Sequence, residues 1–179
     1  MSQIDVNYTT IDSPIGTLLL TADAAGLSGV YMESHKGGPR PTRDWRRDDA
    51  ALAEAVEQLA AYFDGNLRQF DLPLSLLGTP FQQRVWRALC EVSMGHTRTY
   101  AELARRIGAP RAVRAVGAAV GRNPISIIVP CHRIVGSDGG LRGFAGGLAR
   151  KRWLLEHEGV TQELPGRRKQ VAHPALSSR

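Results

Sequence analysis

The chain has 179 residues, of which 42% are hydrophobic, and this is enough for one or two small domains with packed cores. Its two cysteines, Cys90 and Cys131, exclude a disulfide framework and a cysteine-rich zinc site, and we expect no metal and no cofactor. No apolar run is long enough to span a bilayer and the N-terminus has no secretory pattern, so we expect a cytoplasmic protein.

The net charge of +6 is concentrated in one part of the chain. Residues 1–79 carry 6 basic and 11 acidic side chains, whereas residues 80–153 carry 13 basic and 3 acidic ones. Nearly all of these basic residues are arginine. A segregated arginine-rich segment is typical of proteins that bind the phosphate backbone of nucleic acids, and we favour this over an ordinary solvated basic face.

The N-terminal part reads as a small sheet followed by a helix. Residues 6–33 hold three alternating runs separated by turn signals at 13–16 and 25–26, which predicts an antiparallel meander. Residues 34–49 form a polar loop rich in Pro, Gly and Arg. Residues 50–63 predict a helix with a single apolar stripe. The stripe consists of Leu52, Val56, Leu59 and Phe63.

The second half predicts three short helices. Thr79 and Thr99 each begin a capping box, in which a Gln or Glu three residues later reaches back to the start of the helix. A third helix is expected over 111–120, between Pro110 and Gly121. The last two helices are joined through Gly-Ala-Pro, which resembles a helix-turn-helix.

The helix expected over 111–120 consists mostly of Ala, Gly and Val, with Arg111 and Arg114 projecting from it. Small residues allow close packing against a neighbouring helix, and this is the structural interpretation. They also make a helix slim enough to approach the DNA minor groove, which is about 6 Å wide in B-DNA. Groove shape and phosphate contacts would then dominate over a base code.

The apolar run 125–129 predicts a buried strand that ends at Pro130 and presents Cys131 beside His132. A cysteine next to a base at the rim of a sheet is placed like a nucleophile, because thiols react as thiolates. A buried structural cysteine is the alternative, and the pair by itself favours neither. We interpret Cys90, on the first helix of the second half, as structural.

Four motifs in a fixed order favour the interpretation of Cys131 as a nucleophile. RAVGxAxxxNP precedes the apolar run, PCHR follows it, and GFAGGL and RKxWLLxHEG come after that. Together, over about 79–159, they resemble the O6-alkylguanine-DNA alkyltransferases, and the upstream half fits more loosely through SPIG and AYFDG. The resemblance implies an α/β fold. A small N-terminal α/β domain with an antiparallel sheet, and with its linker, is expected over 1–78. A mostly helical DNA-binding and alkyl-acceptor domain with a helix-turn-helix is expected over 79–160, followed by a disordered tail over 161–179.

The resemblance implies direct-reversal DNA repair. A member of this family flips an O6-alkylguanine out of duplex DNA and transfers the alkyl group irreversibly to its own cysteine, here Cys131, with O4-alkylthymine as a second candidate substrate. The implied partner is double-stranded DNA, bound through its minor groove, with no membrane and no obligate protein partner. Displacement by a thiolate yields a thioether, which has no easy hydrolysis route, so each molecule acts once.

The resemblance also implies roles for other residues. His132 is the implied base, coupled to Cys131 through a water, and Glu158 is the carboxylate that orients it. Asn123 is the implied hinge before the cysteine, and Tyr100 contacts the flipped base and helps the guanine leave. The implied DNA contacts are Tyr100, Ser137 and Arg114, and Arg114 fills the gap left by the flipped base. The implied guanine pocket consists of Ile134, Phe144 and Gly146. Plain structural roles are the alternatives: a surface Glu158, an ordinary Asn-Pro turn, and a packed tyrosine.

Three positions depart from the family pattern. Phe144 stands where many members have tyrosine, so one hydroxyl contact to the base is missing. Ala101 and Ala109 stand where some members have polar residues that contact DNA. These departures concern substrate preference and DNA affinity and leave the reaction intact.

Two other functions remain as hypotheses. A non-enzymatic lesion sensor on the same scaffold is disfavoured, because such relatives replace the acceptor cysteine and Cys131 is present here. A thiol hydrolase using Cys131 and His132 would have no reason for the slim basic helix or for Arg114.

Overall fold

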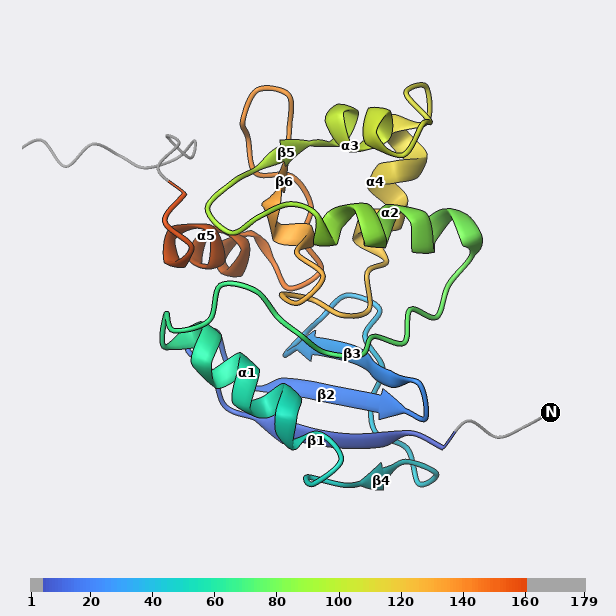
Figure 1. Cartoon of the computed structure of the whole chain (residues 1–179), viewed down its shortest axis with the longest axis vertical. Coiled ribbons are helices and arrows are strands. Elements are labelled where there is room, and N and C mark those ends of the chain that lie inside the picture. The colour runs from blue at the N-terminus through green and yellow to red at the C-terminus, as the bar shows by residue number, and fades with distance from the viewer. Residues whose placement is uncertain (1–4, 161–179) are drawn as a thin grey trace, which may run out of the picture.

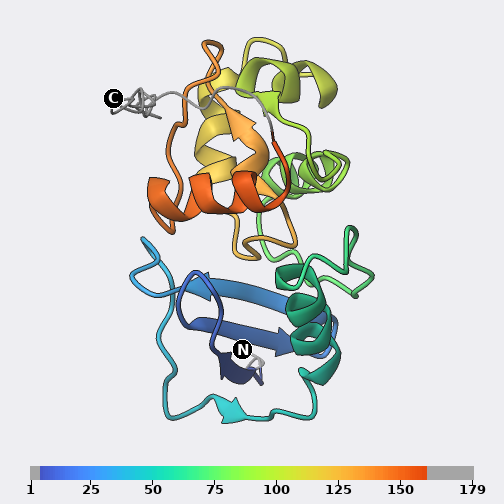
Figure 2. The same ribbon diagram turned by 90° about the vertical axis from the view of Figure 1, so that its left-hand side faces the viewer.

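The computed structural model describes residues 5–160 and consists of a small sheet-containing part and a larger helical part (Figures 1 and 2). The tail expected over 161–179 lies outside the described residues. The expected architecture, a small α/β part with an antiparallel sheet followed by a mostly helical part, is confirmed. Within residues 5–160, no helix is long and apolar enough to cross a membrane.

The sheet is built from the predicted meander. Strands β1 (Asn7–Ile11), β2 (Leu18–Asp23) and β3 (Gly26–Met32) pair antiparallel in sequence order. A two-residue strand, β4 (Arg46–Arg47), pairs parallel with β1 inside the segment expected to be a loop. Helix α1 (Ala53–Phe63) lies against one face of the sheet (Figures 1 and 2).

Both predicted capping boxes are present in the helical part. Thr79 begins α2 (Pro80–Cys90) and Thr99 begins α3 (Tyr100–Arg106), and each threonine hydroxyl accepts a hydrogen bond from the third residue of its helix. Helix α2 packs against α4 (Val113–Gly121), and the indole of Trp86 donates to the Ala119 carbonyl at 2.9 Å. Helices α3 and α4 therefore form the expected helix-turn-helix on a base provided by α2.

Helix α4 begins later than predicted. The backbone N–H of Ala112 donates to the Ala109 carbonyl at 2.9 Å, so residues 109–112 form a turn and the helix starts at Val113. Proline is favoured at the second position of such a turn, which is why Pro110 lies in the turn instead of the first helical position. Arg111 consequently lies outside the helix, whereas Arg114 is in its first turn.

The free edge of β3 joins the two parts of the molecule. Leu27 forms a parallel bridge with Leu74, and Val30 forms one with Ile125. The Val30 N–H donates to the Pro124 carbonyl at 2.9 Å, and Val30 accepts a bond from Ser126. One hydrophobic cluster contains residues from the sheet, from α1 and from the helical part. The segment that leads to Cys131 is thus anchored on the N-terminal sheet.

Candidate active site

The apolar run 125–129 is buried as predicted, but it is not a strand. Ile127 has a positive φ of 74°, the Ile128 N–H donates to Ser126, and the Val129 N–H donates back to Ile125 at 2.9 Å. The prediction of a strand is wrong because the run closes on itself through these local bonds after a single bridge to the sheet. β-Branched residues favour a strand from sequence alone, and nothing in their pattern reports this closure.

Asn123 holds this loop together. Its side-chain amide donates to the Val129 carbonyl at 2.8 Å, and its side-chain oxygen accepts from the Ile125 N–H at 3.0 Å. The residue is buried, so both bonds replace water that these backbone groups cannot reach. The expectation that Asn123 is a hinge before the cysteine remains a prediction, and its bonds are those that such a role needs.

Cys131 and His132 begin η1 (Cys131–Arg133), a single turn of 3₁₀ helix that follows Pro130. The thiol is buried, and this burial raises the pKa of Cys131, while the Asn123 side chain and the nearby Lys151 ammonium act in the opposite direction. The resting group is therefore a thiol that requires a base before it can act as a nucleophile.

His132 is fully buried and is held by only one of its two ring nitrogens. Its Nε2 lies 2.7 Å from Oε1 of Glu158, and its Nδ1 is buried with no hydrogen-bond partner among the described residues. Burial lowers the pKa of His132, and this outweighs the opposite effect of Glu158. A carboxylate only accepts, so Nε2 carries the proton and Nδ1 presents a lone pair. The imidazole is arranged as a neutral base.

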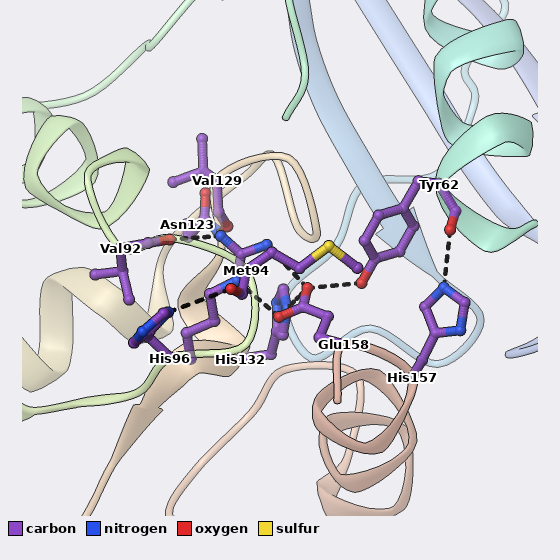
Figure 3. A network of polar contacts seen from close by, with 10 residues as sticks. Tyr62, Val92, Met94, His96, Asn123, Val129, His132, His157 and Glu158 are labelled. Atoms are coloured by element: carbon purple, nitrogen blue, oxygen red, sulfur yellow. Dashed lines mark hydrogen bonds and ion pairs between the residues drawn. The ribbon is translucent and has the colours of Figure 1, made fainter. Parts of the chain in front are cut away.

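Glu158 follows α5 (Leu148–His157) and is the centre of a buried network (Figure 3). Its Oε2 accepts from Nε of Arg133 at 2.8 Å, and its Oε1 accepts from Nη2 of Arg133 at 2.9 Å and from the Tyr62 hydroxyl at 2.8 Å. Burial alone would raise the pKa of Glu158, but the hydrogen bonds and charges of His132 and Arg133 hold it below its usual range. The alternative of a surface glutamate is therefore wrong.

Tyr100, the first residue of α3, lies near the thiol. Burial raises the pKa of its phenol, and the charge of a Cys131 thiolate would raise it further. The ring is half-buried and lies beside α4, where a Cβ added to Gly117 would be 3.8 Å from it. Gly117 and the buried Ala119 of α4 thus serve close packing, as the structural interpretation of that helix expected, whereas Ala115 and Ala118 are exposed.

Lys151 is a buried cation that the sequence analysis missed. Its ammonium donates to the carbonyl oxygens of Ile134 at 2.5 Å and Arg142 at 2.7 Å. Burial lowers the pKa of Lys151 to about 8, opposed by the charge of a Cys131 thiolate. The residue joins the segment after the cysteine to the loop that carries Phe144.

The expected pocket residues differ in their surroundings. Ile134 is fully buried, and Phe144 is half-buried against the hydrophobic core. Gly146 is pressed against the sheet, since an added Cβ would lie 2.2 Å from the Met32 sulfur. Their role in binding guanine remains a prediction.

The expected DNA contacts are on the surface. Arg114 on α4 and Ser137 after β6 (Ile134–Val135) are both exposed and lie outside the buried network around Glu158. Strand β6 pairs parallel with β5 (Arg98–Thr99), which brings the residues before Tyr100 beside those after Cys131. Cys90, which the sequence predicts to be structural, ends α2 with an exposed side chain because Val85, Trp86 and Leu89 occupy the buried face.

The network partners Tyr62 and Arg133 also escaped the sequence analysis. Arg133 belongs to PCHR and Lys151 to RKxW, so their position inside family motifs was the feature of the sequence that could have pointed to them. Tyr62 stands in AYFDG, but that pattern does not point to Glu158, which is 96 residues away along the chain. Within the described range, no group of three or more His, Cys, Asp or Glu side chains is arranged to hold a metal ion.

Comparison with known proteins covers both parts of the chain. Residues 6–76 match the family described as 6-O-methylguanine DNA methyltransferase, ribonuclease-like domain, and residues 80–160 match its DNA binding domain. A methylated-DNA--protein-cysteine methyltransferase of Mycobacterium tuberculosis is 52% identical over 153 residues, covering 86% of this chain and 92% of the relative. One of Methanosarcina barkeri is 50% identical over 151 residues, covering 84% and 96%.

Solved structures give the same relationship. The structure of Mycobacterium tuberculosis OGT in complex with DNA has a TM-score of 0.81 at 52% identity, and the match covers 86% of this chain and 93% of that one. The O6-methylguanine-DNA methyltransferase of Pyrococcus kodakaraensis has a TM-score of 0.60 at 27% identity, with 87% and 99% covered.

Proposed function

The chain belongs to the 6-O-methylguanine DNA methyltransferase family, and on this premise we propose that it removes the alkyl group from an O6-alkylguanine flipped out of duplex DNA and keeps it on Cys131. DNA repair by transfer of an alkyl group from O6-methylguanine to a cysteine is the activity of this family. The flipping, the acceptor residue and the single use of each molecule are the parts that we propose.

The observation that carries the proposal is the state of His132. A buried imidazole with its Nε2 bonded to Glu158 and its Nδ1 unpartnered stands one residue from the thiol. Buried polar atoms without a partner are rare and call for an explanation, which a water between Nδ1 and the thiol provides. His132 then takes the thiol proton through that water, as general bases do.

The reaction is balanced without another reactant. The Cys131 thiol gives its proton to His132, and the thiolate attacks the alkyl carbon in line with the C–O6 bond. The carbon–sulfur bond forms as the carbon–oxygen bond breaks, and guanine takes up a proton as it leaves. Tyr100, half-buried beside the thiol, is our candidate to assist that leaving group through its hydroxyl. The resulting thioether is stable, so each molecule acts once.

DNA binding is assigned to the arginine-rich helical part, residues 79–160. The exposed Arg114 lies in the first turn of α4, whose small residues leave the helix slim. We propose that α4 enters the minor groove, that Arg114 stacks in the gap left by the flipped base, and that Ser137 makes a further DNA contact. A guanidinium in the gap recovers part of the flipping cost of a few kcal/mol.

The guanine pocket is assigned to Ile134, Phe144 and Gly146. Ile134 and Gly146 are buried, whereas the ring of Phe144 is half-buried and has an exposed part that a flipped base can contact. O4-alkylthymine carries its alkyl group on an exocyclic ring oxygen as well, so we include it as a second substrate.

Incubation with duplex DNA that bears methyl-labelled O6-methylguanine tests the proposal. We expect one label per protein molecule, loss of labelling in Cys131→Ser with DNA binding retained, and full labelling in Cys90→Ser, which alters the other cysteine. Binding without any transfer by the unchanged protein would support a lesion sensor instead. Labelling of Cys131→Ser at the original rate would remove Cys131 from the mechanism.

A further inference from the structure

The N-terminal part contributes one side chain directly to the buried network around Glu158. Tyr62 of α1 is 1% exposed, and its hydroxyl donates to Oε1 of Glu158 at 2.8 Å. Figure 3 shows the phenol extending from α1 toward the carboxylate, on the side opposite to His132. All other donors to this carboxylate among the described residues come from η1 in the helical part.

The Tyr62 hydroxyl has little freedom to move. The imidazole of His157, one residue before Glu158, lies 2.8 Å from the backbone carbonyl of Tyr62 through its Nε2. His157 is also stacked on Trp153, with ring centroids 4.9 Å apart and planes 15° from parallel. Phe63, next to Tyr62, contacts both of these rings. Tyr62, near the end of α1, is thus bonded to the end of α5 twice: through its backbone carbonyl to His157 and through its hydroxyl to Glu158.

The hydrogen bond from Tyr62 reduces the negative charge that Oε1 of Glu158 presents to His132. Oε1 accepts from His132, Arg133 and Tyr62 together, so the negative charge that faces the imidazole is shared among three donors. Hydrogen bonds to a carboxylate stabilise its charged form and weaken its pull on any one proton. A carboxylate in this state orients the imidazole without drawing it into the protonated form, which could not act as a base.

Within residues 5–160, the titratable and charged side chains around this centre come from three elements. The titratable and charged side chains that face or act on it are His132 and Arg133 of η1, Tyr62 of α1, and His157 and Lys151 of α5. Of these, only Tyr62 can be altered by removal of a single oxygen while its ring and its neighbours stay in place.

We propose that Tyr62 is a positioning residue for alkyl transfer, which holds Glu158 so that His132 stays neutral with Nδ1 available as the base; this rests on the proposed function. The sheet-containing part therefore takes part in the chemistry of the helical part through one phenol. Without the Tyr62 hydroxyl, the negative charge on Oε1 is shared among two donors instead of three. The imidazolium form of His132 is then stabilised, and the pKa of His132 rises.

The test is the pH profile of single-turnover transfer from O6-benzylguanine as a free base, measured from pH 5 to 9. In Tyr62→Phe we expect the acidic limb to move to higher pH by about half a unit, equivalent to ~0.7 kcal/mol. The rate should be about threefold lower on that limb and nearly unchanged on the plateau. Tyr8→Phe, which removes a hydroxyl from β1 of the same part, should leave the profile in place. A uniform loss of rate at every pH, or an unmoved limb, would overturn the proposal.

Two further measurements separate this role from a merely structural one. In the Glu158→Gln background, Tyr62→Phe should have no additional effect on the acidic limb, whereas independent effects would multiply. If Tyr62→Phe does not fold, 3,5-difluorotyrosine at position 62 keeps the ring and strengthens the donor, and it should move the limb to lower pH. An unmoved limb there contradicts the proposal. Failure of the unchanged protein to take any label from O6-methylguanine in duplex DNA would refute the proposed function instead.

Discussion

The side-chain amide of Asn123 donates to the backbone carbonyl of Val129 at 2.8 Å, and this bond closes the loop that presents Cys131. Asn123→Ala would leave the Ile125 N–H buried without its partner, whereas the Val129 carbonyl would keep the bond that it accepts from the Cys131 N–H at 2.8 Å. At about 1–3 kcal/mol for one such buried group, we expect a loss of that size in the free energy of unfolding. Urea denaturation measures this loss.

Asn66→Ala is the matched control, because Asn66 is exposed after the end of α1. It should change the free energy of unfolding by less than about 0.5 kcal/mol. An equally small change in Asn123→Ala would mean that water can reach the loop and that Asn123 does not hold it closed.

The fold was predictable where local signals and tertiary packing agree. Thr79 and Thr99 formed the two capping boxes that their spacing predicts, since such caps depend on residues only three positions apart. For the run 125–129, by contrast, local signals gave the wrong prediction of a strand. Its β-branched residues favour a strand, but the positive φ of Ile127 and the bonds from Asn123 depend on a closure that no periodicity reports.

The candidate site shows the same limit at longer range. Cys131, His132 and Glu158 stand in motifs that imply their roles, whereas AYFDG, which contains Tyr62, implies no role for that hydroxyl. A bond between α1 and the end of α5 depends on how two distant segments pack, and propensity and patterning say nothing about that contact. Arg133 was visible inside PCHR, but a buried arginine is uncommon enough that sequence alone favours the surface.

Burial of a neutral His132 makes stability depend on pH. Its pKa is lowered by burial in the folded protein, so below about pH 6.5 the unfolded chain binds a proton that the folded one excludes. Stability therefore falls as the pH drops from about 6.5 toward the folded pKa, by up to about 1.36 kcal/mol per pH unit from this group. His132→Gln, which cannot titrate, should show a shallower decline in urea denaturation between pH 7.5 and 5.

His96→Gln supplies the comparison, since His96 is exposed. Its decline should follow that of the unchanged protein. If the His132→Gln curve is as steep as the other two, the imidazole is already protonated in the folded state and is not the base that we assign.

Arg114 is assigned to the gap left by a flipped base, and this predicts a difference between two substrates. Arg114→Ala should slow transfer from O6-methylguanine in duplex DNA much more than transfer from free O6-benzylguanine, which needs no flipping. Loss of one stacked cation of about 0.5–2 kcal/mol corresponds to roughly 2- to 30-fold on the duplex. Arg68→Ala, at an exposed arginine of the N-terminal part, should alter neither rate. Equal losses on both substrates would assign Arg114 to the fold or to the thiol.

Phe144 allows a test of the pocket by addition of one atom. The ring is half-buried against the core and keeps an aromatic wall, but it lacks the hydroxyl that many relatives have at this position. Phe144→Tyr should raise the rate on O6-methylguanine by roughly a few-fold to tenfold, because a hydrogen bond contributes about 0.5–1.5 kcal/mol net. Single-turnover rates on duplex DNA measure the effect.

The opposite result has a distinct physical meaning. If the surroundings have closed around the phenyl ring, the new oxygen would be buried without a partner at a cost of about 1–3 kcal/mol, and the rate would fall. We expect the gain, because the exposed part of the ring gives the oxygen room to reach the base. Phe81→Tyr, at a half-buried ring at the start of α2, controls for the general effect of a hydroxyl. A drop in rate for Phe144→Tyr at an unchanged melting temperature would show that this pocket contacts guanine differently from its tyrosine-bearing relatives.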